Sequence, residues 1–495
     1  MKKSKFPLIT LLVWPLTLLL VGCAPVGPDY QPPRPDLPAR WSTEQEQNAP
    51  TPVEDTRRWW GLFNDPLLTE LITRAITANQ DLRIAGSRIK AARARYRITT
   101  ASSSPSLAAA AAYSHSRRSE NSGSTGGNQD LFQAGFDADW EIDLFGGQRR
   151  SVEAATATLV ASEENRRDVL ITLEAEVARN YFELRGSQRR LATAKDNLRT
   201  QDMTLATVQG RFRLGLGSRL EVAQAQTQKS LLAAQIPALD KKISQSTSQL
   251  ALLLNLQPAG LAPRLAQPAI SPAFPLTLPT GLSSDLLRRR PDIRRAERRL
   301  AAATAEIGVA TADLFPRFSL AALVGLQSSN LADLVSSGSR FWSLGPSLSL
   351  PLFNRGKLQA AVEITEAQRE EMLAGYEQTV LTALVETENT LVLFSREQET
   401  RSSLAEAVKT GRQAVTLSEG LYKSGLTGLT DVLTSQRSQY QAEDQLIGSE
   451  QQLALYTIAL YKALGGGWQI AEQATSAGPA DSQAPQKTQQ LNTKQ

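Results

Sequence analysis

The chain has 495 residues, and 41% of them are hydrophobic, which is enough to bury a large core. Its 54 Lys and Arg residues against 49 Asp and Glu residues leave a net charge of +5, too small over this length to indicate an acidic partner. The densest basic run, 288–299, is interrupted by acids in a helical pattern, so we interpret it as a solvated helix face and expect no nucleic-acid binding. A single cysteine and a single histidine exclude an internal disulfide and a Cys/His metal cluster.

Residues 1–22 have the pattern of a secretion signal. Lysines precede an apolar run, 6–21, that is too short and too close to the start for an ordinary membrane-spanning helix. The run ends in Leu20-Val21-Gly22-Cys23, which resembles a bacterial lipoprotein signal, in which the cysteine is lipidated and becomes the first mature residue. Ala24, in place of Asp, favours passage to the outer membrane. The alternative is an ordinary signal peptide with an incidental thiol.

The next segment, 23–65, is rich in Pro and Gln and has little periodicity, which predicts a lipidated, extended anchor without a core of its own. A helix is expected from Pro66 to about Ala101, because Asn64 or Asp65 can cap it and Pro66 fits a first turn.

After Pro105 the apolar residues recur at every second position. This change predicts strands at about 105–116 and 131–144, joined by a Gly/Ser/Asn-rich turn. One face of the second strand is apolar and aromatic and includes Trp140. The other face carries four acids: Asp137, Asp139, Glu141 and Asp143.

A long helix without proline is expected at about 148–212, which at ~1.5 Å per residue would run about 100 Å. Leucines spaced by seven, from Leu184 to Leu205, and Phe212 after them predict coiled-coil packing. A Gly-containing turn then leads into a shorter return helix at about 218–256.

The same order of elements recurs in the second half of the chain. Residues 211–255 align without a gap on residues 210 positions later, so that Phe212 meets Tyr422 and Glu221 meets Asp431. This repeat predicts strands at about 317–327 and 341–351, and helices at about 283–313, 355–423 and 427–464. We therefore expect two helix–hairpin–helix repeats, 66–275 and 276–468, followed by a disordered tail, 469–495.

Four in-phase strands of about ten residues, each with an apolar and a polar face, match the requirements of a transmembrane barrel. Four strands cannot close, because an open edge leaves unpaired backbone groups in lipid. Three chains would give twelve strands, with Trp140 and Trp342 facing lipid and the four acids facing the lumen. The alternative for any one strand is an amphipathic hairpin on a soluble core. The predicted fold class is thus an α+β membrane protein, in which a trimeric twelve-stranded outer-membrane barrel continues into a helical coiled-coil tunnel.

Glu221 and Asp431 are the most suggestive polar residues, because they are equivalent in the two repeats and follow the turns at the far ends of the long helices. In a trimer they would form acidic rings whose local field attracts cations, and packing around Phe212 and Tyr422 is expected to hold the turns inward as a periplasmic gate. The alternative, which is compatible with this role, is that both are helix-start acids favoured by the helix dipole. We expect neither an enzyme nor a cofactor, because the one histidine, His115, lies on a predicted strand near its turn and no catalytic cluster is visible.

Six motifs carry a resemblance to the TolC-like outer-membrane efflux proteins, and most closely to the lipoprotein branch that works with resistance-nodulation-division (RND) pumps. They span nearly the whole mature chain in the family's order. The motifs begin at Cys23 (CAPVGPDY), Trp59 (WWGLFNDPLL), Asp143 (DLFG), Asp285 (DLLRRRPDI), Pro351 (PLFNRG) and Gly420 (GLYKSG).

The resemblance implies a homotrimer with a twelve-stranded barrel, a helical periplasmic tunnel, and a tip that stays closed until a periplasmic adaptor docks. It assigns Asp431 to the acidic ring of the entrance and Tyr422 to the network that locks it. Thr427 and Thr434 stand where some members place an Arg and a second acid. Arg211, Arg213 and Arg219 are the alternative partners for the lock.

The function expected from these features is a passive exit duct for drugs or other small toxic compounds, supplied by an inner-membrane RND pump. One alternative is the exit duct of a type I protein secretion system, and another is a purely structural coiled-coil lipoprotein, which the four amphipathic strands oppose. Substrate identity is not expected in this chain, because in such a machine the pump selects.

Overall fold

The computed structural model describes residues 25–38, 41, 58–119, 121, 127–266 and 285–468. The predicted signal, Cys23 and the predicted tail lie outside the described residues. The chain forms two compact units. The first contains Arg83–Arg166, Pro291–Thr382 and the N-terminal residues up to Asp36; the second contains Leu37–Leu82, Arg167–Arg290 and the residues from Ala383 onward. Each unit therefore draws on both predicted repeats.

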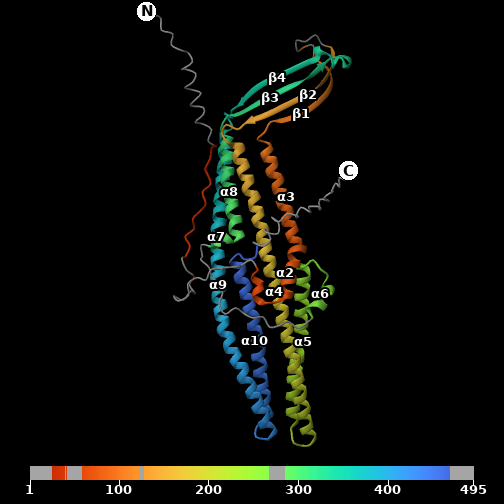
Figure 1. The fold of residues 1–495 in the computed structure, drawn as a ribbon, viewed down its shortest axis with the longest axis vertical. Coiled ribbons are helices and arrows are strands. Elements are labelled where there is room, and N and C mark those ends of the chain that lie inside the picture. Colours follow the sequence, from red (N-terminus) through yellow and green to blue (C-terminus); the bar gives the residue numbers. More distant parts are fainter. Residues whose placement is uncertain are drawn as a thin grey trace, which may run out of the picture. The chain divides into compact units, whose positions relative to one another are not determined.

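The first unit contains one antiparallel sheet of four strands in the order β1-β2-β3-β4 (Figure 1). The strands are β1 (Ser106–Arg117), β2 (Asn128–Ile142), β3 (Arg317–Ser328) and β4 (Arg340–Ser349), all within a few residues of the predicted bounds. Their register brings apolar residues of all four strands into common rows on one face. One such row is Ala109, Phe136, Val324 and Trp342. The predicted phase of the four strands is confirmed.

The two long helices also agree with the sequence pattern. They are α4 (Gly147–Arg213) and α9 (Arg355–Lys423), and each contributes residues to both units. Each turns back into a return helix of 35 residues, α5 (Arg219–Leu253) or α10 (Leu429–Ala463). Leu184 and Leu205 of the predicted heptad series are buried, but the side chain of Phe212 at its end is 45% exposed.

Two predicted helices are each interrupted. The first, expected at 66–101, is α2 (Pro66–Ala78) and α3 (Gln80–Ala101), because Asn79 has an extended backbone and its Oδ1 accepts hydrogen bonds from the backbone N–H groups of Asp81 and Leu82. The second, expected at 283–313, is α7 (Asp285–Arg289) and α8 (Pro291–Ala312), because Pro291 has no N–H to continue the helix. Four short helices, η1 (Trp59–Phe63), α6 (Pro258–Leu265), η3 (Leu331–Asp333) and η4 (Ser337–Ser339), were not expected.

The core of the second unit includes a group of aromatic side chains around η1. The rings of Trp59 and Tyr461 stack with centroids 5.9 Å apart, and those of Phe63 and Phe182 lie 4.5 Å apart. Asp65 accepts hydrogen bonds from Leu67 N and Leu68 N, so it caps α2 as expected, and its second oxygen accepts from the Tyr181 hydroxyl. One carboxylate thus fixes both the start of α2 and its position against α4.

Glu174 of α4 is a carboxyl group buried in this core. Its side chain is 1% exposed and accepts a hydrogen bond from the Trp59 side chain. Its Oε2 has no hydrogen-bond partner among the described residues and lies under Gly467, where a Cβ atom would be only 1.9 Å away. Burial raises the pKa of Glu174 well above its ordinary value, and the Trp59 hydrogen bond opposes this only in part. The pKa of Glu174 is therefore raised by a lack of solvent, not by a neighbouring charge.

The pH dependence of stability follows from this shift. In the unfolded chain Glu174 ionises near its ordinary pKa of about 4.3, whereas in the folded chain it stays protonated to higher pH. Folding is thus disfavoured increasingly as the pH rises above about 4.3 towards the folded-state pKa. We expect Glu174→Gln to raise the midpoint of thermal unfolding in detergent, and to raise it more at about pH 8 than at about pH 5. An equal shift at both pH values would mean that Glu174 does not titrate in this way.

Candidate functional site

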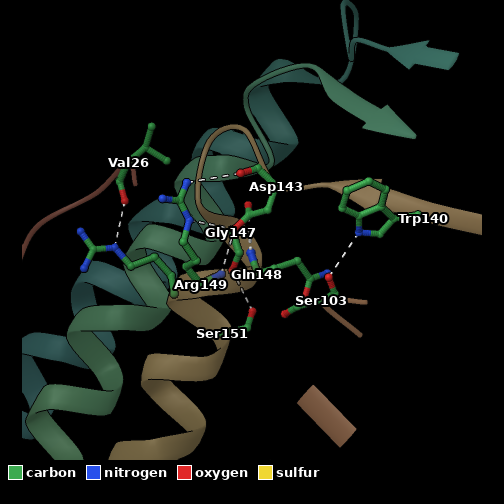
Figure 2. Close-up of polar contacts among 9 residues, drawn as sticks. Val26, Ser103, Trp140, Asp143, Gly147, Gln148, Arg149 and Ser151 are labelled. Atoms are coloured by element: carbon green, nitrogen blue, oxygen red, sulfur yellow. Dashed lines mark hydrogen bonds and ion pairs between the residues drawn. The ribbon is translucent and has the colours of Figure 1, made fainter. Parts of the chain in front are cut away.

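The base of the sheet, where β2 gives way to α4, receives the first described residues of the chain (Figure 2). Val26 N donates to Phe145 O at 2.9 Å. Pro25 lies against Gly146, whose φ of 82° is left-handed and where a Cβ atom would be 2.4 Å from the Pro25 Cβ. A glycine is thus needed at 146 both for the backbone turn and for this close approach.

Arg150, in the first turn of α4, holds the same segment. Its guanidinium donates to the carbonyls of Val26 and Gly27 at 3.2 and 3.3 Å and to the carboxylate of Asp29 at 2.7 Å. It also pairs with Glu153 at 2.8 Å, and its own side chain is 5% exposed. Charged hydrogen bonds from a buried arginine are stronger than neutral ones, so the N-terminal segment is firmly seated on α4. No sequence pattern distinguishes Arg150 from its neighbours.

Asp143 is the one predicted lumen acid that does not lie on the strand. β2 ends at Ile142, and Asp143 accepts hydrogen bonds from Gln148 N at 3.3 Å and from Arg149 N at 3.0 Å (Figure 2). Its carboxylate also pairs with the Arg149 side chain at 3.1 Å. The predicted strand position of Asp143 is therefore wrong, because the orphan N–H groups at the start of α4 bind this carboxylate.

Asp137, Asp139 and Glu141 lie on β2 and share its polar face, as the alternation predicts. The register pairs them with Leu323, Ala321 and Ser319 of β3. Trp140 and Trp342 lie on the apolar face, and the Trp140 indole N–H donates to Ser103 O at 3.3 Å (Figure 2). Trp342 is 78% exposed in the single chain, as a side chain directed away from any core of its own chain would be.

At the turns of the helical hairpins, the two equivalent acids have different surroundings. Glu221 forms a capping box with Ser218 at the start of α5: Ser218 N donates to its carboxylate at 2.8 Å, and Glu221 N donates to the Ser218 hydroxyl at 3.2 Å. Asp431, in the first turn of α10, accepts a hydrogen bond from the Thr427 hydroxyl. Both are helix-start acids, and Thr427 is a partner that the sequence did not indicate.

Tyr422 links the two hairpin turns. It is 8% exposed and packs in a cluster with Leu205 and Val208 of α4, Ala225 of α5, and Leu429 and Val432 of α10. The Arg211 guanidinium lies 4.8 Å from the centroid of its ring, so one of the three arginines proposed as lock partners does reach it. Burial, and next the nearby Glu221, raise the pKa of Tyr422. Phe212, which is 45% exposed, is not in this cluster, and the Tyr422 ring is covered by Arg211 instead.

None of the described helices is both long and apolar enough to cross a membrane. Among the described residues, no group of three or more His, Cys, Asp or Glu side chains could hold a metal ion.

Comparisons with known proteins agree on one family. The family model described as outer membrane efflux protein matches the chain twice, over residues 71–256 and 282–466. The solvent efflux pump outer membrane protein SrpC of Pseudomonas putida is 34% identical over 95% of this chain and 100% of that protein. Nodulation protein T of Rhizobium leguminosarum bv. trifolii is 31% identical over 91% of this chain and 96% of its own length. The solved outer-membrane channel OprN superposes with a TM-score of 0.86 at 35% identity, covering 90% of this chain and 99% of that one.

Proposed function

The chain belongs to the outer membrane efflux protein family and is an outer-membrane channel component of an efflux system, and from this premise we propose that it is a passive duct. In this proposal an inner-membrane RND-type pump supplies the energy, a periplasmic adaptor docks at the helical tip, and drugs or other small toxic compounds leave through the duct. The observation that carries the proposal is the match of the family model to both halves of the chain, each of which contains two strands of the sheet.

A homotrimer is the assembly that the sheet favours. In one chain β1 and β4 are edge strands, and lipid offers no donors or acceptors for their unpaired backbone groups. Pairing β4 of one chain with β1 of the next removes every edge once the ring closes. With three chains the ring has twelve strands, whose apolar rows with Trp140 and Trp342 face lipid and whose acids Asp137, Asp139 and Glu141 face the lumen.

Small compounds are favoured over proteins as the cargo. SrpC is named for solvent efflux, and other relatives are named for toluene efflux and for pyoverdine export, all of which concern small molecules. The rival, a duct for type I protein secretion, has the same requirement for a barrel and a tunnel. The other rival, a structural coiled-coil lipoprotein, has no use for the four-stranded sheet.

Deletion of the gene tests the cargo class. We expect the deletion to lower the inhibitory concentrations of several small toxic compounds, with restoration by the parent chain, because their exit route is lost. Secretion of proteins into the medium should be unchanged. Unaltered susceptibility together with a protein retained in the cells would instead favour the secretion duct.

Lipidation of Cys23 is supported by where the chain enters the structure. Pro25 and Val26 are seated beside Phe145 and Gly146, directly after β2 ends. In the sequence only Ala24 separates Cys23 from Pro25, and two residues of extended chain span no more than about 7 Å. Acyl chains on Cys23 would enter the same leaflet that the lower end of the barrel meets, and two or more chains would anchor the protein stably.

Metabolic labelling tests this anchor. We expect palmitate incorporation into the parent chain and none into Cys23→Ala, because only a cysteine provides the acceptor thiol. Arg150→Ala is the matched control: it loosens the seat of the N-terminal segment but keeps the thiol, so labelling should persist. Undiminished labelling of Cys23→Ala would exclude this modification.

The periplasmic gate is proposed at the two hairpin turns, with Asp431 and Glu221 as its acids and Tyr422 as its lock, and with Phe212 lining the turn beside it. In a trimer each acid occurs three times around the axis, and like charges at close quarters attract cations. The Tyr422 cluster joins α4, α5 and α10, so it ties the first hairpin to the second. Arg211 covers its ring from the α4 side.

Conductance in planar bilayers tests the gate. Asp431→Ala should weaken block by multivalent cations, whereas Thr434→Ala, an exposed neutral residue one turn along α10, should not. Glu221→Gln keeps a capping-box residue and removes only the charge, so any effect on cation block reports the acidic ring rather than the helix cap.

Tyr422→Ala should raise basal conductance by opening the cluster, while Tyr422→Phe should resemble the parent, because the Tyr422 hydroxyl has no hydrogen-bond partner among the described residues. Parent-like conductance and block in Asp431→Ala would leave Asp431 as a helix-start acid only.

A further inference from the structure

The apolar face of the sheet spans most of the height of a lipid-facing band. From Trp140 to Phe132 along β2 the chain advances eight residues, or about 26 Å along the strand at ~3.3 Å per residue. At the tilt of about 40° that barrel strands have, this is about 20 Å of the ~25 Å apolar band of outer-membrane barrels. Trp140 marks the end near the anchor. At the other end Tyr113 of β1 stacks on Phe132 with centroids 4.8 Å apart. These aromatic residues are of the kind found at both lipid–water boundaries.

The first polar row beyond this upper boundary is already ordered. His115 and Asp130 are paired in the register, and His115 Nδ1 lies 2.8 Å from Asp130 Oδ1. The Tyr113 hydroxyl donates to the same oxygen at 2.8 Å. Arg117 follows on the same face, opposite Asn128, and is exposed. The Asp130 carboxylate thus interacts with both Tyr113 and His115. Arg117 lies on the same face, two residues beyond His115 on β1.

A second arginine lies at the other edge of the sheet. Arg340 begins β4, is exposed, and shares the apolar face with Trp342. Because the two hairpins are repeats, the pairing of β2 with β3 inside one chain is the template for the pairing of β4 with β1 of the next chain. Inside the chain, Phe132 pairs with Ser328.

Transferring this pair to the junction between chains brings the two arginines together. Ser328 ends β3 as Arg117 ends β1, both in strands of 12 residues. The shared Leu-Phe motif at 144 and 352 makes Arg340 the counterpart of Phe132, which places Arg340 directly opposite the partner's Arg117. Aligning the hairpins by their strand pairing instead makes Trp342 the counterpart of Phe132, which leaves Arg340 diagonal to the partner's Arg117. Long side chains reach each other in both positions.

Two guanidinium groups in neighbouring positions of a strand pair present positive charge together, which attracts an anion. The pair lies at the boundary of the lipid-facing band, and guanidinium groups bind phosphate oxygens through two parallel hydrogen bonds. Resting on the trimeric barrel proposed above, we infer that each junction between chains binds a phosphorylated lipid headgroup of the outer leaflet, held by Arg340 of one chain and the partner's Arg117, with Trp342 against its acyl part.

Native mass spectrometry of the purified trimer in detergent tests this site. The probes are lipid A with both phosphates, the same lipid A without phosphates, and inorganic phosphate as competitor. We expect the phosphorylated lipid to bind preferentially, and Arg340→Gln and Arg117→Gln each to weaken its binding about fivefold, the usual effect of one cation near a charged membrane surface. Arg88→Gln, at an exposed arginine of α3, is the matched control and should bind as the parent does.

Several outcomes would overturn the inference. Equal binding of the two forms of lipid A would remove the role of phosphate, and unchanged binding by Arg340→Gln would remove the role of this arginine. Displacement by millimolar inorganic phosphate would indicate a simple anion site. Without lipid, the Arg340→Gln trimer should be as heat-stable as the parent, because Arg340 acts on the lipid and not on the assembly. Loss of the trimer would make Arg340 a structural residue. If the parent protein is a monomer, the proposed trimer is contradicted. If the parent is a trimer that binds both forms of lipid A equally, only the lipid site is contradicted.

Discussion

The unpaired edges of the four-stranded sheet are the constraint on which the rest of the structure depends. Within the described part of a single chain the apolar face of the sheet stays uncovered, with Trp342 78% exposed, and β1 and β4 are each paired along one edge only. In lipid the apolar face is satisfied, but the edges are not. Ring closure satisfies both, and it also requires that the helices continuing from each strand meet their counterparts from other chains. The apolar helix residues that are exposed in the single chain would then be covered by the neighbouring chains of the ring.

The passage from strand to helix is the second place where backbone groups must find partners. Asp143 receives the first N–H groups of α4, and Val26 adds its own backbone bond to Phe145 just beside it. Arg150 fixes the incoming segment through two carbonyls and a carboxylate. The N-terminal segment from Pro25, the end of β2 and the beginning of a 67-residue helix are thereby joined within a few residues. A substitution that displaces any one of these three elements would therefore displace the other two.

Local patterns in the sequence were sufficient for the strands and the long helices. Alternation located β1 to β4, the absence of proline with leucines in sevens located α4, and the internal repeat located α9. The break at Asn79 was missed because it depends on Leu253, whose carbonyl accepts from the Asn79 amide at 3.1 Å from 174 residues away. Arg150 and Glu174 were missed for the same reason, since burial depends on distant residues such as Gly27 and Gly467. At the hairpin turns the acids were found by repetition, but Thr427 as the partner of Asp431 was not, because it replaces the arginine that the family pattern suggested.

The equivalent hairpins differ in how their return helices begin. Ser218 and Glu221 close the start of α5 with two reciprocal hydrogen bonds, whereas Gly428 gives α10 no side-chain cap. Glycine in place of serine at an N-cap costs a helix only roughly a few tenths of a kcal/mol, but it leaves the first turn without a side chain to hold it and so freer to fray. Around a closed ring of six hairpins, stiff and pliant turns would therefore alternate. The ring would thus be nearly sixfold symmetric in shape but only threefold symmetric in stiffness. A force applied evenly to the end of the tunnel would deform the α10 turns first.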